Sequence, residues 1–138
     1  MSLPEKIVGK MYDNDAFSQW LGIEVVEVKD SYCKLKMTVR KEMLNGFQIA
    51  HGGIAYSLAD SALAFASNSR GRKSLSVETS ISHLVSVKEG DVITAVTNEI
   101  SLSQKIGVYL ISIKNQDYKK VAIFKGTVYR SSKEWFGE

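Results

Sequence analysis

The chain has 138 residues, of which 44% are hydrophobic and 24% are charged, and its formal net charge is +3. This length is typical of one domain, and this balance of apolar and charged residues excludes an intrinsically disordered chain. We therefore expect a single domain over residues 1–138, with a helical segment at 1–20. A chain of this size buries a core but not a large enclosed cavity as well, so a sizeable site is expected at a subunit boundary.

Charge and cysteine content narrow the function classes further. The basic residues are dispersed, apart from short clusters at 70–73 and 119–120 without interleaved aromatic residues, so nucleic acid is not an expected partner. Cys33 is the only cysteine, which excludes an intrachain disulfide and a cysteine-based metal site. No stretch of about 18 apolar residues and no basic-then-apolar leader is present, so we expect a cytoplasmic protein without a membrane partner.

The first part of the chain predicts helix followed by strand. Apolar spacing indicates a helix from Pro4 to Trp20, with a break near 13–15. Two strands are expected next, at 23–27 and 32–40. The second strand alternates between polar residues and an apolar face, which is expected to be buried and consists of Cys33, Leu35, Met37 and Val39.

The rest of the chain predicts one long helix and then a series of long strands. The helix covers 52–69 and is rich in alanine and leucine. Strand-like runs follow at 75–87, 92–102, 108–114 and 121–130. A helix that is apolar nearly all round, among five or six antiparallel strands, has to be wrapped by the sheet. The pattern thus predicts an α+β hot-dog fold, a curled antiparallel sheet of five to six strands around one long central helix.

The start of the long helix has features of a carbonyl-binding site. The first N–H groups of a helix lack intrahelical acceptors, and Gly52 and Gly53 let a ligand approach them closely. The Gly52 N–H could stabilise an oxyanion, although a glycine pair could also serve only a tight turn. His51 could orient the loop, donate a hydrogen bond or transfer a proton, and Asn45 could fix a carbonyl or a water or simply belong to a turn.

Asp60 is a carboxylate within the apolar helix. Because an unpaired buried charge is costly, it must pair with a cation or a helix N-terminus, face solvent, or face a site as nucleophile or general base. Eight residues separate Gly52 from Asp60, which is about 12 Å along an α-helix. A base and an oxyanion donor must each lie roughly 3 Å from their reacting atoms. A catalytic motif here therefore predicts a site shared by antiparallel helices of two subunits.

Residues 48–69 closely resemble the phenylacetate-degradation (PaaI-like) type of hot-dog acyl-CoA thioesterase, and 104–109 and 121–127 match it as well. The resemblance extends over about residues 21–130. It implies hydrolysis of an acyl-CoA thioester, either aryl-acetyl-CoA-like or medium-chain, to the free acid and CoA. The shared site predicted from the spacing of Gly52 and Asp60 requires a homodimer. Exposed strand edges in such sheets favour further assembly, so a dimer and a dimer of dimers, a homotetramer, both stay open. No metal or other cofactor is expected, because CoA is part of the substrate.

The resemblance also implies roles for single residues. Asp60 would be the nucleophile or the base that activates water, and the Gly52 N–H would hold the thioester oxygen. Asn45 and His51 would support the loop and the thioester end, and Ser76 falls where some relatives place a hydroxyl near the attacking water. The further residues implied in substrate binding are Gly53, Arg70, Arg72 and Lys73. The three basic ones could meet the CoA phosphates or equally form a solvated loop.

One segment departs from the family pattern. Relatives commonly carry a proline within 82–86, and this chain has none. His83 could lie near the acyl pocket or on the surface, so the acyl specificity is left open. Two other functions also stay open: a hot-dog hydratase or dehydratase acting on enoyl-CoA or acyl-carrier-protein substrates, and a non-catalytic acyl-CoA-binding protein.

Overall fold

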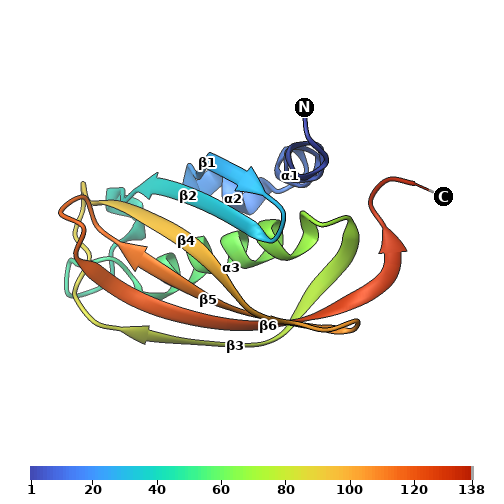
Figure 1. The fold of residues 1–138 in the computed structure, drawn as a ribbon. Coiled ribbons are helices and arrows are strands. Elements are labelled where there is room, and N and C mark those ends of the chain that lie inside the picture. Colours follow the sequence, from blue (N-terminus) through green and yellow to red (C-terminus); the bar gives the residue numbers. More distant parts are fainter. Residues whose placement is uncertain (138) are drawn as a thin grey trace.

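The computed structural model describes residues 1–137, and the chain begins with two short helices (Figure 1). Helix α1 spans Leu3–Asp13 and helix α2 spans Ala16–Leu21. The break lies where the sequence predicts it, because Asp15 caps α2 by accepting the Ser18 N–H at 2.9 Å. A side-chain oxygen at this place satisfies a free N–H of the new helix, and so starts it.

Six antiparallel strands form one sheet in the spatial order β1-β2-β4-β5-β6-β3. Their bounds are β1 Glu24–Lys29, β2 Tyr32–Thr38, β3 Arg72–His83, β4 Val92–Leu102, β5 Ile106–Lys114 and β6 Lys120–Glu134. The apolar face predicted for the second strand is confirmed, since all four of its residues are buried. Strands β1 and β3 are the edges of the sheet, so each has a neighbouring strand on one side only.

Helix α3 (Gly52–Asn68) lies inside the curl of the sheet and contacts β2 through β6 (Figure 1). Small residues on its buried side allow close packing, and Ala59, Ala62 and Ala66 are fully buried. The predicted α+β hot-dog architecture, with one central helix wrapped by the sheet, is confirmed. Neither α3 nor another helix within residues 1–137 is long and apolar enough to cross a lipid bilayer.

Strand β3 differs from the strand predicted at 75–87, because it begins at Arg72 and ends at His83. Beyond this end the chain leaves the sheet. The Val87 carbonyl accepts the Ala50 N–H at 2.7 Å, and thereby joins this segment to the loop before α3. The far end of β3 consequently lies beside the start of the central helix.

Candidate active site

Asn45 shapes the loop that leads into α3. Its side-chain oxygen accepts the N–H groups of Phe47 at 2.9 Å and of Ile49 at 3.4 Å, which closes a turn. At the end of this loop the His51 N–H donates to the Met43 carbonyl at 2.8 Å. Asn45 therefore fixes the path of the backbone into the helix, and its side chain also lines the cavity at the helix start.

His51 is the N-cap of α3. Its Nδ1 accepts the Gly53 N–H at 3.2 Å, so one of the free donors at the helix start is already used within the protein. The neighbouring Gly52 N–H has no acceptor among residues 1–137. Capping by His51 therefore leaves the Gly52 N–H as the donor that is open to a ligand.

A cavity of about 290 Å³ lies at this helix start. Its walls come from the loop before α3, from the first turn of α3 and from the segment after β3. Asn45, His51 and Gly52 all line it. The structure thus brings together three of the residues that the sequence predicts for the thioester end of the site.

Asp60 is half-buried in the middle of α3. Burial raises the pKa of its carboxyl group above the ordinary value of 3.8, and the nearby Asp15 carboxylate raises it further. None of the ion pairs among residues 1–137 involves Asp60. A partner cation therefore does not explain this carboxylate in the described part of the chain, and its raised basicity suits a base or nucleophile.

A second cavity, of about 670 Å³, holds Asp60. Ser76, near the start of β3, lines the same cavity, and so does Lys73. None of the residues lining this cavity lines the cavity at the helix start. One chain therefore has two separate cavities, one at the Gly52 N–H and one at Asp60 (the two candidate half-sites), in agreement with a spacing of about 12 Å along the helix.

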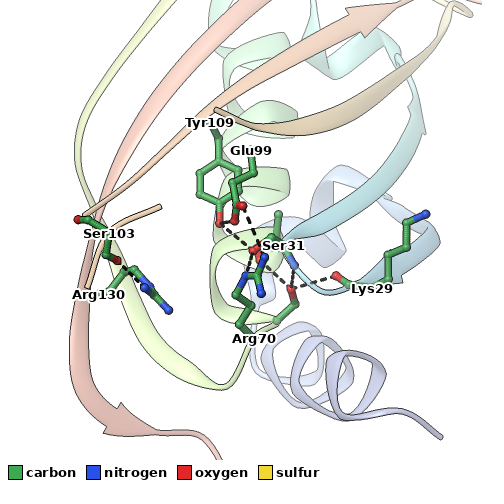
Figure 2. A network of polar contacts seen from close by, with 9 residues as sticks. Lys29, Ser31, Arg70, Glu99, Ser103, Tyr109 and Arg130 are labelled. Carbon is green, nitrogen blue, oxygen red and sulfur yellow. Dashed lines mark hydrogen bonds and ion pairs between the residues drawn. The ribbon is translucent and has the colours of Figure 1, made fainter. Parts of the chain in front are cut away.

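Arg70 belongs to a polar network at the end of α3, away from both cavities (Figure 2). Its guanidinium donates to the Ser31 hydroxyl and pairs with Glu99 at 3.5 Å. The Tyr109 hydroxyl also donates to the Ser31 oxygen, at 3.3 Å. These contacts hold Arg70 against the β1–β2 turn and β4, so part of its hydrogen-bonding capacity is used in the fold.

Arg72 and Lys73 point to different surroundings. The Arg72 guanidinium donates to the Gln104 carbonyl in the β4–β5 turn. The Lys73 ammonium lies 4.9 Å from the centre of the Trp135 ring and lines the cavity of Asp60. Of the three basic residues predicted for the substrate, Lys73 is the one that the structure places in a half-site.

Asp15 is a neighbour of Asp60 that the sequence did not reveal. In the sequence, this residue stands out only as part of the predicted helix break at 13–15. No local pattern indicates which residues lie near its side chain in the fold. In the structure a 2.7 Å hydrogen bond between the Ser18 and Ser61 hydroxyls joins α2 to α3. This tertiary contact brings Asp15 close enough to Asp60 to raise its pKa.

His83, for which surface and pocket positions were both open, lines the cavity of Gly52. A Cβ atom on Gly52 would lie 3.2 Å from His83 Nε2, so the imidazole covers the first residue of α3. The only signal of this in the sequence is the departure from the family pattern within 82–86. That departure alone does not tell which face of β3 the side chain takes.

Comparison with known proteins shows which family the chain belongs to. The family model of the thioesterase superfamily matches residues 47–122. The acyl-coenzyme A thioesterase PaaI of Escherichia coli is 40% identical over 120 residues, which cover 87% of this chain and 86% of that protein. The structure of the E. coli PaaI protein matches with a TM-score of 0.93 and 36% identity over 96% of both chains. A phenylacetic acid degradation protein PaaI from Thermus thermophilus matches with a TM-score of 0.82 and 32% identity, over 85% of this chain and all of that one. The resemblance seen in the sequence is confirmed, and the chain belongs to the thioesterase superfamily as a PaaI-like protein.

Proposed function

We propose that this protein hydrolyses an acyl-CoA thioester, of the aryl-acetyl or medium-chain type, to the free acid and CoA. The observation that carries this proposal is the 40% identity to the acyl-coenzyme A thioesterase PaaI of E. coli over 87% of the chain. The site supports it independently. A free N–H at a helix start and an unpaired, half-buried carboxylate are the groups that thioester hydrolysis requires.

The proposed chemistry uses Asp60 as a general base or as a nucleophile. As a base, it takes a proton from water while the water oxygen attacks the thioester carbonyl; as a nucleophile, its own oxygen attacks. In both routes the carbonyl electron pair moves onto oxygen, where the Gly52 N–H and the helix dipole stabilise the charge. Return of the pair breaks the C–S bond, and the CoA sulfur leaves. In the base route the free acid forms directly, and the sulfur takes up the proton that Asp60 removed from water. In the nucleophile route an anhydride of Asp60 and the acyl group remains; water hydrolyses it to the free acid, restores Asp60 and supplies the proton that the sulfur takes up. The raised pKa of Asp60 supports either role, because it makes the ionised carboxylate more basic.

The site is proposed to be shared between two subunits of a homodimer. The two half-sites lie toward opposite ends of β3, with Ser76 near one end and His83 at the other. Because β3 is an edge strand, it can pair antiparallel with the same strand of a second copy. Such a two-fold pairing carries the Asp60 end of one chain toward the Gly52 end of the other, and it forms two equal sites.

The edge of β3 has the side chains that such an interface needs. Leu75 is 75% exposed and Val77 is 62% exposed in the single chain. Large apolar side chains on an unpaired edge are a liability for a monomer, and pairing with a second copy removes them from water. Lys73 lines the cavity of Asp60, and this position supports the proposal that its ammonium binds a phosphate of CoA.

The test is release of free thiol from a panel of aryl- and alkyl-CoA thioesters, with wild type beside Asp60→Asn. We expect the variant to lose at least about 100-fold in kcat, since the amide can neither attack nor take a proton. Full activity of the variant contradicts the mechanism. Addition of water to an enoyl-CoA without thiol release would instead indicate a hydratase, and binding without any turnover would indicate an acyl-CoA-binding protein.

A further inference from the structure

The imidazole of His83 lies against the position that a side chain would take at Gly52, the first residue of α3. A Cβ atom on Gly52 would lie 3.2 Å from His83 Nε2 and 3.5 Å from Cε1. The backbone next to His83 is held at the end of β3, where the Leu84 N–H donates to the Val121 carbonyl at 2.8 Å. An imidazole nitrogen therefore lies beside the Gly52 N–H, which has no acceptor within residues 1–137.

His83 lies on the face of β3 that is turned toward α3. Two positions earlier, Ile81 packs against the core. Thr79, a further two positions earlier, hydrogen-bonds the Tyr56 hydroxyl of α3 at 2.6 Å. Because side chains alternate between the two faces of a strand, His83 lies on the same face as Thr79 and Ile81. Its side chain is nevertheless exposed, and it lines the cavity that Gly52 also lines. The ring is therefore both positioned by the fold and accessible to a ligand.

The two nitrogens can serve one oxygen atom. Covalent geometry puts the Gly52 nitrogen about 2.5 Å from the Cβ position, so His83 Nε2 lies within about 5.7 Å of that nitrogen. Two donors that share one acceptor at about 2.9 Å can be separated by up to roughly 5.8 Å. A single oxygen atom can thus lie within hydrogen-bond distance of both nitrogens.

We propose that His83 is a second donor to the thioester oxygen, acting with the Gly52 N–H. This inference rests on the proposed function. As the new C–O bond forms, the carbonyl electron pair moves to oxygen, which accepts hydrogen bonds from the Gly52 N–H and from an N–H at Nε2 of His83. When the C–S bond breaks, the proton taken from water by Asp60 passes to the departing sulfur. His83 neither gains nor loses a proton, and its effect is on the developing charge.

The test compares His83→Ala, which removes the donor, with His83→Gln, whose amide keeps an N–H at similar reach. Both kcat and KM are measured for thiol release. Because a donor to the developing charge acts mainly in the transition state, we expect His83→Ala to lose about 10- to 100-fold in kcat with little change in KM. His83→Gln should retain at least about a third of the wild-type kcat, because it restores the hydrogen bond.

Ser82→Ala is the matched control, because Ser82 is the exposed neighbour of His83 and lies at neither cavity. It should behave as wild type, and thermal unfolding of all variants identifies any loss of fold. Wild-type kcat in His83→Ala refutes the inference, as does an effect on KM alone or an equal loss in the Ala and Gln variants. If wild type releases thiol and Asp60→Asn does not, any of these outcomes for the His83 variants refutes only the role of His83. Absence of thiol release by wild type refutes the proposed function, and the inference with it.

Discussion

Asp60, the carboxylate proposed to be catalytic, opposes the stability of the fold at neutral pH. The pKa of its carboxyl group is raised by burial and then by Asp15, so the folded chain binds this proton more tightly than the unfolded chain does. The resulting stabilisation is complete below the ordinary pKa of 3.8, and it is lost as pH rises through the higher pKa of the folded state. At neutral pH the ionised carboxylate therefore lowers the free energy of unfolding relative to a neutral side chain.

Asp60→Asn should consequently be more stable than wild type at pH 7, by a few degrees in Tm at most because the group is only half-buried. The gain should shrink as the pH is lowered and the wild-type carboxyl group becomes protonated. Thermal unfolding across pH measures this. Asp13→Asn is the control, because it removes the same charge at an exposed position. A difference in Tm that is independent of pH contradicts the account.

Asp15 should set the pH dependence of the reaction. Its carboxylate is the second cause, after burial, of the raised pKa of Asp60. In Asp15→Asn the pKa of Asp60 should fall while staying above its ordinary value, so the acidic limb of kcat/KM against pH moves to lower pH. Asn still caps α2, and the plateau activity should stay within about twofold. An unchanged acidic limb would show that the two carboxylates do not interact in the active protein.

Local sequence pattern was sufficient to predict the central helix and most of the strands. The end of β3 and the neighbours of Asp60 and Gly52 depend on tertiary contacts instead. The helix with Gly52 and Asp60 was predictable because its apolar composition and its start signal are local. The end of β3 was not predictable from local pattern. There the chain leaves the sheet, and the Val87 carbonyl accepts the Ala50 N–H, a hydrogen bond between segments distant in the sequence. The positions of Asp15 and His83 depend on such packing too. Sequence pattern therefore predicted the helix that carries Gly52 and Asp60, but it did not reveal which residues of other elements lie beside them.

The approach of α3 to the sheet depends on Gly126 of β6. A Cβ atom there would lie 2.5 Å from Leu63 Cδ2 and 3.0 Å from Cδ1, and Leu63 both packs in the core and lines the cavity of Asp60. Gly126→Ala should cost about 1–3 kcal/mol, because an added methyl group overpacks this contact. It should also lower kcat by displacing the helix segment that carries Asp60.

Gly9→Ala is the control for this change. Gly9 lies in α1, and an added Cβ meets no other atom within 4 Å. Because alanine favours a helix by up to about 1 kcal/mol over glycine, this variant should be neutral or more stable. Urea unfolding of both variants measures the two free energies. Equal stability of the two would show that α3 does not depend on the missing side chain of Gly126.

At the scale of the whole molecule, the two half-sites and the sheet edge point to the same assembly. The Gly52 and Asp60 cavities share no lining residue, so one chain is not expected to complete a site. Edge strand β3 exposes Leu75 and Val77, which a two-fold partner would cover. In the proposed dimer catalysis and association are linked, because each of its sites requires the interface.

Mixing two inactive chains tests this link. Asp60→Asn retains the Gly52 half-site, and Gly52→Val, whose side chain meets His83 and shields the N–H, retains the Asp60 half-site. Each homodimer should be inactive. A heterodimer should have one site that combines the intact halves and one that combines both defects. With random pairing, half of the dimers are heterodimers with one working site in two, so thiol release should recover to about a quarter of the wild-type rate. If each chain formed its own site, every site in the mixture would carry one defect, and mixing would restore no activity.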